Sequence, residues 1–213
     1  MKITAINGSP KANGGVSEII IRQMEKILGT EVDTYNARRL VKDETPREAF
    51  AEMLNADVIL IVFPLYVDSL PSPLIELLMQ LSTATYDGIG KKPKIYTIIN
   101  CGFYESEQTR LAIDMIEHFA NHAGLAWGYG LGIGCGPMLV AMGENWQKGP
   151  AGSVHKALAD MANGIKKQAD RDNTFIVLRF PRFAYKAAGH MSWRSVAKKN
   201  GVMKTIRAKP YSG

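Results

Sequence analysis

One short stretch of this 213-residue chain limits its fold more than any other. Residues 57–63 are Asp-Val-Ile-Leu-Ile-Val-Phe, so an unbroken run of apolar side chains follows the aspartate. A strand with one face in water alternates apolar and polar side chains, whereas a strand covered on both faces is apolar throughout. This stretch therefore predicts a central strand of a parallel sheet with helices on both faces.

Strand and helix patterns alternate along residues 1–170. The spacing of Ile19, Ile20 and Met24 predicts a helix, and Thr45-Pro46-Arg47-Glu48 has the capping-box spacing of a helix start. Strands separated by helices favour an α/β fold with an open parallel sheet. We expect strands at residues 2–6, 31–35, 57–63, 94–100 and 125–133, and helices at 16–28, from Thr45, and at 73–81, 107–122 and 152–168.

A loop rich in Gly and Ser joins the first strand to the first helix. It spans residues 7–17, Asn-Gly-Ser-Pro-Lys-Ala-Asn-Gly-Gly-Val-Ser. Glycines let backbone N–H groups approach an anion, the helix N-terminus presents unpaired N–H groups, and Lys11 adds a positive charge. The loop lacks the Gly-Lys-Ser/Thr end of a Walker loop and the spacing of a dinucleotide loop. It predicts a site for a single phosphomonoester, and the simpler alternative is an ordinary turn.

Two further loops should lie near this one. In an open parallel sheet, ligands bind beyond the carboxyl ends of the strands, where the strand order reverses. Residues 64–71 offer Leu65 and Tyr66 as apolar or flat surfaces. Residues 100–105 offer Asn100 and the Gly102 N–H for the edge of a heteroaromatic ring. A phosphate site beside an aromatic slot predicts a mononucleotide ligand.

These motifs resemble those of the NADPH-dependent FMN reductases and related flavodoxin-like NAD(P)H oxidoreductases. The resemblance covers roughly residues 1–170. It implies a flavodoxin-like five-stranded sheet in the order 2-1-3-4-5, FMN as cofactor, NAD(P)H as co-substrate, a small-molecule electron acceptor and a homodimer. The residues that carry it are Gly8-Ser9-Pro10-Lys11 with Ser17, Phe63-Pro64-Leu65-Tyr66 with Pro71, and Asn100-Cys101-Gly102.

The resemblance also implies a set of cofactor-binding residues. The first loop would bind the FMN phosphate, the second would line the flavin, and the third would approach its pyrimidine side. FMN can take a hydride from a nicotinamide without a protein acid or base, so no catalytic side chain is expected. Backbone N–H groups around residues 65–67 and at Gly102 would supply the electrostatic part. The expected set is Ser9, Lys11, Asn13, Gly15, Ser17, Pro64, Leu65, Tyr66, Val67, Asn100, Cys101 and Gly102.

The sequence favours an FMN-dependent NAD(P)H oxidoreductase that reduces a free flavin, a quinone, a nitro compound or an azo compound. One alternative is a non-enzymatic electron carrier like flavodoxin, although flavodoxins tend to be acidic and this chain has a pI of about 9.3. Another alternative is a flavin-binding module at a membrane surface.

Composition excludes several other classes of protein. With 46% hydrophobic and 22% charged residues, the chain has the composition of an ordinary globular protein. It has two cysteines, Cys101 and Cys135, and no C-x-x-C motif. His118 and His122 have no evident third partner, so no metal is expected. The absence of a leader pattern and of a long apolar run predicts a cytoplasmic protein, and no nucleic-acid partner is expected.

The segment 174–213 carries the excess positive charge. It has nine Lys or Arg and no Asp or Glu, which leaves 17 basic and 20 acidic residues, and a net charge of −3, in residues 1–173. Aromatic residues interleave with these charges, unlike in a disordered basic arm. We expect an FMN-binding domain at 1–173 and a packed extension at 174–213, with a strand-like piece at 175–180 and one or two short helices. The candidate partners of this extension are the NADPH phosphates, an anionic membrane and an acidic protein. The simpler alternative is a basic face that is only solvated by water.

Overall fold

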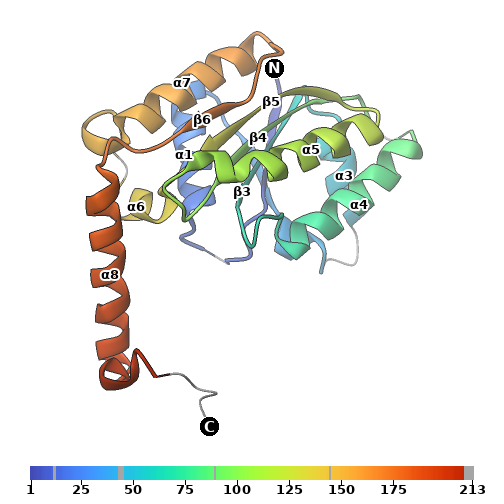
Figure 1. Cartoon of the computed structure of the whole chain (residues 1–213). Helices are drawn as coiled ribbons and strands as arrows, with labels where there is room; N and C mark the ends of the chain where they lie inside the picture. Colours follow the sequence, from blue (N-terminus) through green and yellow to red (C-terminus); the bar gives the residue numbers. More distant parts are fainter. Residues whose placement is uncertain (12, 43–45, 89, 144, 209–213) are drawn as a thin grey trace. The chain divides into compact units, whose positions relative to one another are not determined.

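A computed structural model describes residues 1–11, 13–42, 46–88, 90–143 and 145–208. The chain divides into two compact units, Met1–Arg179 and Phe180–Gly213. The division expected at residue 173 therefore falls within the first unit. This first unit consists of a parallel sheet between two layers of helices (Figure 1).

In the described part of the chain, the sheet has six parallel strands in the order β2-β1-β3-β4-β5-β6. The central strand β3 pairs with β1 and β4, and its residues from Val58 to Phe63 are fully buried. This confirms the predicted flavodoxin-like α/β fold and the order of its first five strands. The strands are β1 Ile3–Asn7, β2 Asp33–Asn36, β3 Val58–Pro64, β4 Lys94–Asn100, β5 Ala126–Ile133 and β6 Thr174–Ile176.

Helices cover both faces of the sheet (Figure 1). On one face α1, Val16–Leu28, packs beside α7, Gly152–Lys166. On the other face lie α3 Pro46–Leu54, α4 Ser72–Tyr86 and α5 Arg110–His122. The apolar face predicted for the first helix is buried, and α1 ends at Gly29, whose left-handed backbone (φ 68°) lets its N–H bond to Glu25 O.

Several short elements go beyond the sequence prediction. The helix α2, Ala37–Leu40, begins after Asn36, whose side chain accepts a hydrogen bond from Arg39 N at 3.2 Å. The helix α6, Gly136–Ala141, follows β5, and the 3₁₀ turn η2 is Gly149–Ala151. The 3₁₀ turn η1, Ser106–Thr109, precedes α5. The Thr45 helix cap lies outside the described residues.

The sixth strand is the main departure from the predicted sheet. Residues 131–133 of β5 pair with residues 174–176, which the sequence assigned to the extension. Gly132 permits this pairing, because a Cβ there would lie 2.8 Å from Phe175 Cδ1 and would collide with Thr109 Oγ1. The first residues of the expected extension are therefore part of the sheet.

The described part of the second unit contains one long helix, where the sequence predicted one or two short helices. This helix is α8, Arg182–Lys199, and the 3₁₀ turn η3, Met203–Thr205, follows it. Among the described residues, none of the helices combines the length and the apolar character needed to cross a bilayer.

Candidate active site

The loops after β1, β3, β4 and β5 meet at the carboxyl edge of the sheet. They surround a cavity of about 650 Å³. Ligands of open α/β sheets bind at this edge, because the loops separate there and leave a crevice. The lining residues are Ser9, Lys11, Gly15, Val16, Ser17, Pro64, Leu65, Tyr66, Val67, Asn100, Gly102, Phe103, Pro137 and Val140.

One end of the cavity lies at the N-terminus of α1. The N-cap residue Gly15 makes no side-chain capping bond, so no cap side chain occupies the first-turn N–H groups of the helix. Ser9, Lys11 and Ser17 line the same end. A Cβ on Gly15 would lie only 3.2 Å from Ser9 Oγ, so a side chain there would narrow the space. Helix amides, two hydroxyls and a lysine suit the phosphate of FMN.

Hydrogen bonds between side chains and backbone fix the shape of the loop before α1. Asn7 Oδ1 accepts a bond from Ser9 N at 3.0 Å, and Ser9 Oγ accepts one from Lys11 N at 3.3 Å. Arg38 Nη1 donates to Pro10 O at 2.9 Å. Because these bonds are made within the protein, the loop is shaped without a ligand.

Asn100 joins three elements at the base of the cavity. Its Nδ2 donates to Ser17 Oγ and to Phe63 O, both at 3.2 Å, and the residue is buried. Its backbone O accepts a bond from Leu65 N at 2.8 Å. The ends of β3 and β4 are thereby tied to the first turn of α1, which sets the position of Ser17.

A tight turn over Tyr66–Ser69 contributes Tyr66 and Val67 to the lining of the cavity. Tyr66 N donates to Ser69 O at 3.2 Å, and Ser69 N donates to Tyr66 O at 3.1 Å. The two central residues, Val67 and Asp68, have φ values of 49° and 58°. Both are left-handed, as in a type I′ turn, where Asn and Gly are preferred. A β-branched residue is strained there.

Comparison with protein families identifies the fold's relatives. The sequence model of the NADPH-dependent FMN reductases matches residues 1–129. The chain belongs to this family. FMN is therefore its cofactor, NAD(P)H is its co-substrate, and the protein is a flavin-dependent oxidoreductase. No curated protein matches the chain.

Solved structures show the FMN reductase fold at low sequence identity. An NADPH-quinone reductase from P. pentosaceus has 15% identity and a TM-score of 0.53, over 78% of this chain and 97% of its own. An oxidoreductase from Corynebacterium diphtheriae has 14% identity and a TM-score of 0.54, over 78% of this chain and 96% of its own. A flavodoxin, WrbA-like protein from Agrobacterium tumefaciens has 10% identity and a TM-score of 0.52, over 78% of this chain and 99% of its own.

Most of the residues expected at the cofactor of an FMN reductase line one cavity here. Asn13 and Cys101 do not line it. Asn13 is exposed, and Cys101 is buried with its Sγ 3.8 Å from both Phe103 O and Glu105 O. Burial raises the pKa of the Cys101 thiol to about 11. The ten that line the cavity are Ser9, Lys11, Gly15, Ser17, Pro64, Leu65, Tyr66, Val67, Asn100 and Gly102.

The sequence did not single out four further lining residues. These are Val16, Phe103, Pro137 and Val140. Pro137 and Val140 belong to α6, which is held at the site by Gly136 N donating to Cys101 O at 2.8 Å and Cys135 N donating to Phe103 O at 2.7 Å. The only sequence signal was a Gly-Pro pair just after the fifth strand.

We expect a Val67→Asn variant of this FMN reductase to be more stable than the wild type. The Val67 side chain is 97% exposed and loses little burial, while Asn tolerates the left-handed backbone. Relief of the strain should raise the free energy of unfolding by about 1 kcal/mol. Urea denaturation of the FMN-free proteins measures this change. A Val67→Thr variant keeps the β-branch and is the control; equal stability of all three proteins would contradict the strain.

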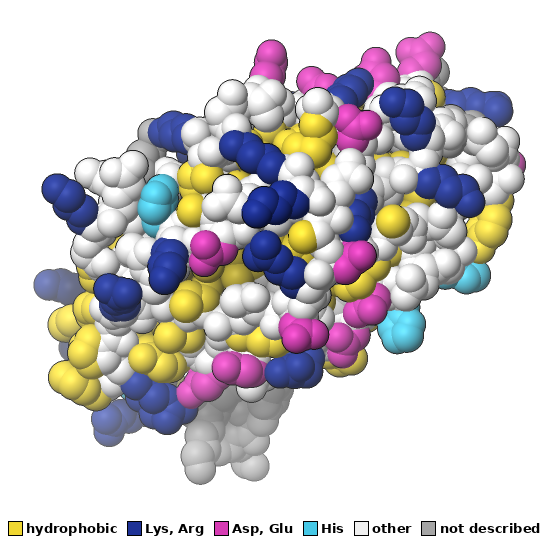
Figure 2. Space-filling view, turned by 90° about the horizontal axis from the view of Figure 1, so that it is seen from above, with side chains coloured by type: hydrophobic (Ala, Val, Ile, Leu, Met, Phe, Trp, Pro, Cys, Tyr) yellow, Lys and Arg dark blue, Asp and Glu magenta, His cyan; other side chains and the backbone are white. Residues whose placement is uncertain are grey.

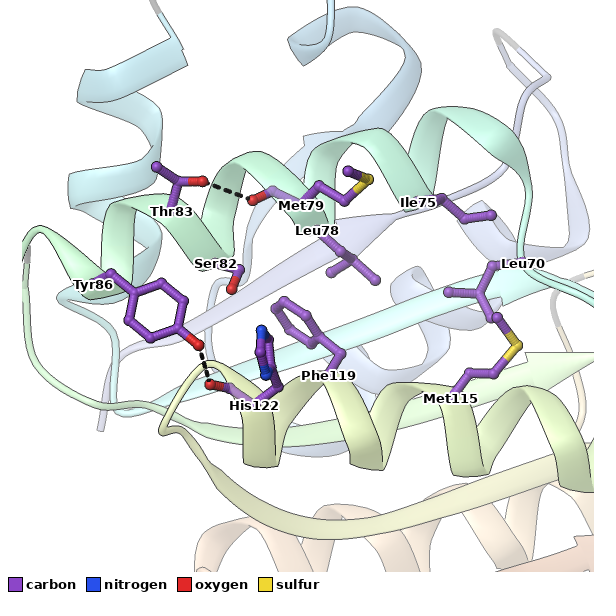
Figure 3. A pocket seen from close by; sticks show the side chains of 10 residues that line it. All are labelled: Leu70, Ile75, Leu78, Met79, Ser82, Thr83, Tyr86, Met115, Phe119 and His122. Atoms are coloured by element: carbon purple, nitrogen blue, oxygen red, sulfur yellow. Dashed lines mark hydrogen bonds between the residues drawn. The ribbon is translucent and has the colours of Figure 1, made fainter.

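A second groove lies between α4 and α5 (Figure 3). It has a volume of about 420 Å³, and its described lining holds no Lys, Arg, Asp or Glu. Tyr86 closes one end, where its OH donates to His122 O at 2.7 Å and its ring meets the His122 ring edge-on. The described lining of the groove therefore offers no lysine or arginine to pair with a phosphate. The lining residues are Leu70, Ile75, Leu78, Met79, Ser82, Thr83, Tyr86, Met115, Phe119 and His122.

Within the part of the chain that the structure describes, no group of three His, Cys, Asp or Glu side chains could hold a metal ion.

Proposed function

We propose that the cavity binds FMN with its phosphate at the N-terminus of α1 and its ring against the Pro64–Val67 turn. We further propose that the electrons pass to a flat organic acceptor, namely a free flavin, a quinone, a nitro compound or an azo compound. The observation that supports this most strongly is the mixed lining of the cavity, in which two hydroxyls, Lys11 and the N-terminus of α1 occur together with the apolar side chains of the Pro64–Val67 turn.

The residues of this chain would bind and orient the cofactor. When bound, FMN accepts a hydride from NAD(P)H and passes the electrons to the acceptor. Ser9, Lys11 and Ser17 would anchor the phosphate and so fix the distance of the ring from the helix. Leu65 N donates to Asn100 O and Tyr66 N donates to Ser69 O, so these two groups hold the turn in shape. They are not the anion-stabilising donors that the sequence suggested.

The exposed rim of the cavity supports a flat, apolar acceptor. Tyr66, Val67, Phe103 and Val140 are all large apolar residues that stay exposed while lining the cavity. Exposed apolar side chains gathered at one cavity mark a binding site, because water solvates them poorly. None of the four carries a charge, so they would contact the flat, apolar face of an acceptor rather than a charged group on it.

We also propose that the protein forms a homodimer through the groove between α4 and α5. A second copy brings the same uncharged surface to the contact, so a two-fold arrangement places no charged lining residues against each other. Ile75 and Met79 are exposed along this groove and would gain burial.

Anaerobic reduction of the purified holoprotein tests the oxidoreductase proposal. NADPH or NADH should bleach the bound flavin within seconds. A quinone, a nitroarene, an azo dye or free FMN, added next in separate samples, should restore its absorbance faster than buffer does. A bound flavin that stays oxidised with both nicotinamides would overturn the proposed hydride transfer. Rapid bleaching with no acceptor effect would overturn only the acceptor class.

A further inference from the structure

The described part of the second unit is strongly basic. Residues 180–208 contain no Asp or Glu, whereas acidic and basic side chains lie intermixed over much of the molecular surface in Figure 2. On α8, Ala197 is the only described residue that is buried. The second unit therefore presents an almost wholly exposed cationic helix. The Lys and Arg residues within 180–208 are Arg182, Lys186, Arg194, Lys198, Lys199, Lys204 and Arg207.

Basic residues recur every four positions along α8. Arg182, Lys186, His190, Arg194 and Lys198 follow this spacing, so they form a row that winds slowly along one half of the helix. With about 100° of rotation per residue, the opposite half carries Tyr185, Val196 and Lys199 together with small residues. These small residues are Ala184, Ala188, Ser192 and Ser195.

Phe183 and Trp193 lie on the same half of α8 as the basic row, Met191 lies at its edge, and Val196, which is 45% exposed, lies on the opposite half. Phe183, Met191 and Trp193 are 77%, 66% and 74% exposed. The helical rotation places them between or beside the basic residues rather than on a separate face. Any partner of this half must therefore offer negative charge and an apolar environment within one side-chain length of each other.

We propose that α8 lies along the surface of an anionic phospholipid bilayer. The lipid phosphates accept hydrogen bonds from Lys and Arg, whose long stems let the charges stay in the headgroup layer. Phe183, Met191 and Trp193 enter the acyl boundary just below, where Trp is favoured. Since no described helix can span a membrane, this binding is peripheral. It goes beyond the proposed function and does not depend on it.

The apolar residues favour lipid over nucleic acid as the partner. Met191 on α8 and Val202, Met203 and Ile206 after it are exposed and non-aromatic. Such side chains cannot stack on bases as aromatic rings do, and a phosphate backbone offers them no apolar environment. The acyl boundary of a bilayer would remove these apolar side chains from water. Pairing of α8 with a second α8 is disfavoured, because it would bring two basic rows together.

Vesicle co-sedimentation of the full-length holoprotein tests the proposal. Vesicles of phosphatidylcholine with about one third phosphatidylserine should bind it at least about tenfold more tightly than phosphatidylcholine alone. Raising the salt to about 0.5 M should weaken the binding by a similar factor. Absence of binding to anionic vesicles overturns the proposal, and so does tighter binding to duplex or single-stranded DNA than to the vesicles.

Two matched variants test the insertion of apolar side chains. Phe183→Ser/Met191→Ser/Trp193→Ser should weaken vesicle binding at least about tenfold, while Ala184→Ser/Ala188→Ser on the opposite half should leave it unchanged. Unchanged flavin content and reductase activity show that both variants are folded. Equal binding by the two variants would overturn the insertion. A blue shift of tryptophan fluorescence on vesicles, which disappears in Trp193→Phe, gives a second readout.

Discussion

A Ser17→Asp variant is expected to lose at least about 1,000-fold in FMN affinity and to be purified without flavin. Ser17 lies in the first turn of α1 and lines the phosphate end of the cavity. A carboxylate about 4 Å from a bound phosphate would raise the free energy of the complex by about 4 kcal/mol for each unit of phosphate charge. The fold should survive, because an acidic residue near a helix N-terminus is favourable and Asn100 Nδ2 can donate to it.

Riboflavin and a neutral variant separate phosphate repulsion from general damage. Riboflavin has the same ring without the phosphate, so Ser17→Asp should bind it within about threefold of the wild type. Ser17→Asn introduces no charge and should keep FMN. Fluorescence titration of the flavin measures the affinities of wild type and Ser17→Asp for FMN and for riboflavin, and that of Ser17→Asn for FMN. Equal losses for FMN and riboflavin would show that the phosphate lies elsewhere.

Local patterns were enough to predict the sheet and most of the cavity. The unbroken apolar run of β3 and the Gly-Ser loop before α1 are continuous in sequence, so their structural meaning does not depend on distant residues. Strand ends in a parallel sheet meet at one edge, and this rule alone brought the loops at residues 7–17, 64–71 and 100–105 together.

The remaining features depend on contacts between distant residues. The sequence predicts a strand-like piece at residues 175–180 but not its pairing with β5, which depends on Gly132 letting Phe175 approach β5. The helix α6 has six residues, and its Pro137 and Val140 reach the cavity only because α6 is bonded to the loop after β4.

The placement of Cys101 follows from strand geometry. Asn100 bonds to Ser17 on the α1 side of the sheet. Successive side chains of a strand point to opposite faces, so Cys101 packs with the core residues of the α5 side, such as Ile113 and Ile116. Proximity along the sequence to a lining residue was therefore a poor guide to whether the Cys101 side chain lines the cavity.

An Asn100→Asp variant should lose about 3 kcal/mol of unfolding free energy at pH 8, and much less in mild acid. Asn100 is buried, and its Nδ2 donates to Phe63 O at 3.2 Å. A carboxylate oxygen at that position would face a carbonyl oxygen, which repels the charged form, whereas a protonated carboxyl can donate to it. Burial and repulsion therefore raise the pKa of the new carboxyl in the folded state.

The sign of the pH dependence follows from this raised pKa. The unfolded state releases its proton near pH 4, so the variant loses stability as the pH rises from there to the folded pKa, by about 1.4 kcal/mol per pH unit. Asn100→Leu has similar volume and does not titrate, so its deficit against the wild type should be the same at pH 5 and pH 8. Urea denaturation at both pH values measures the two deficits. A deficit of Asn100→Asp that does not change with pH would mean that the side chain at position 100 meets water instead of Phe63 O.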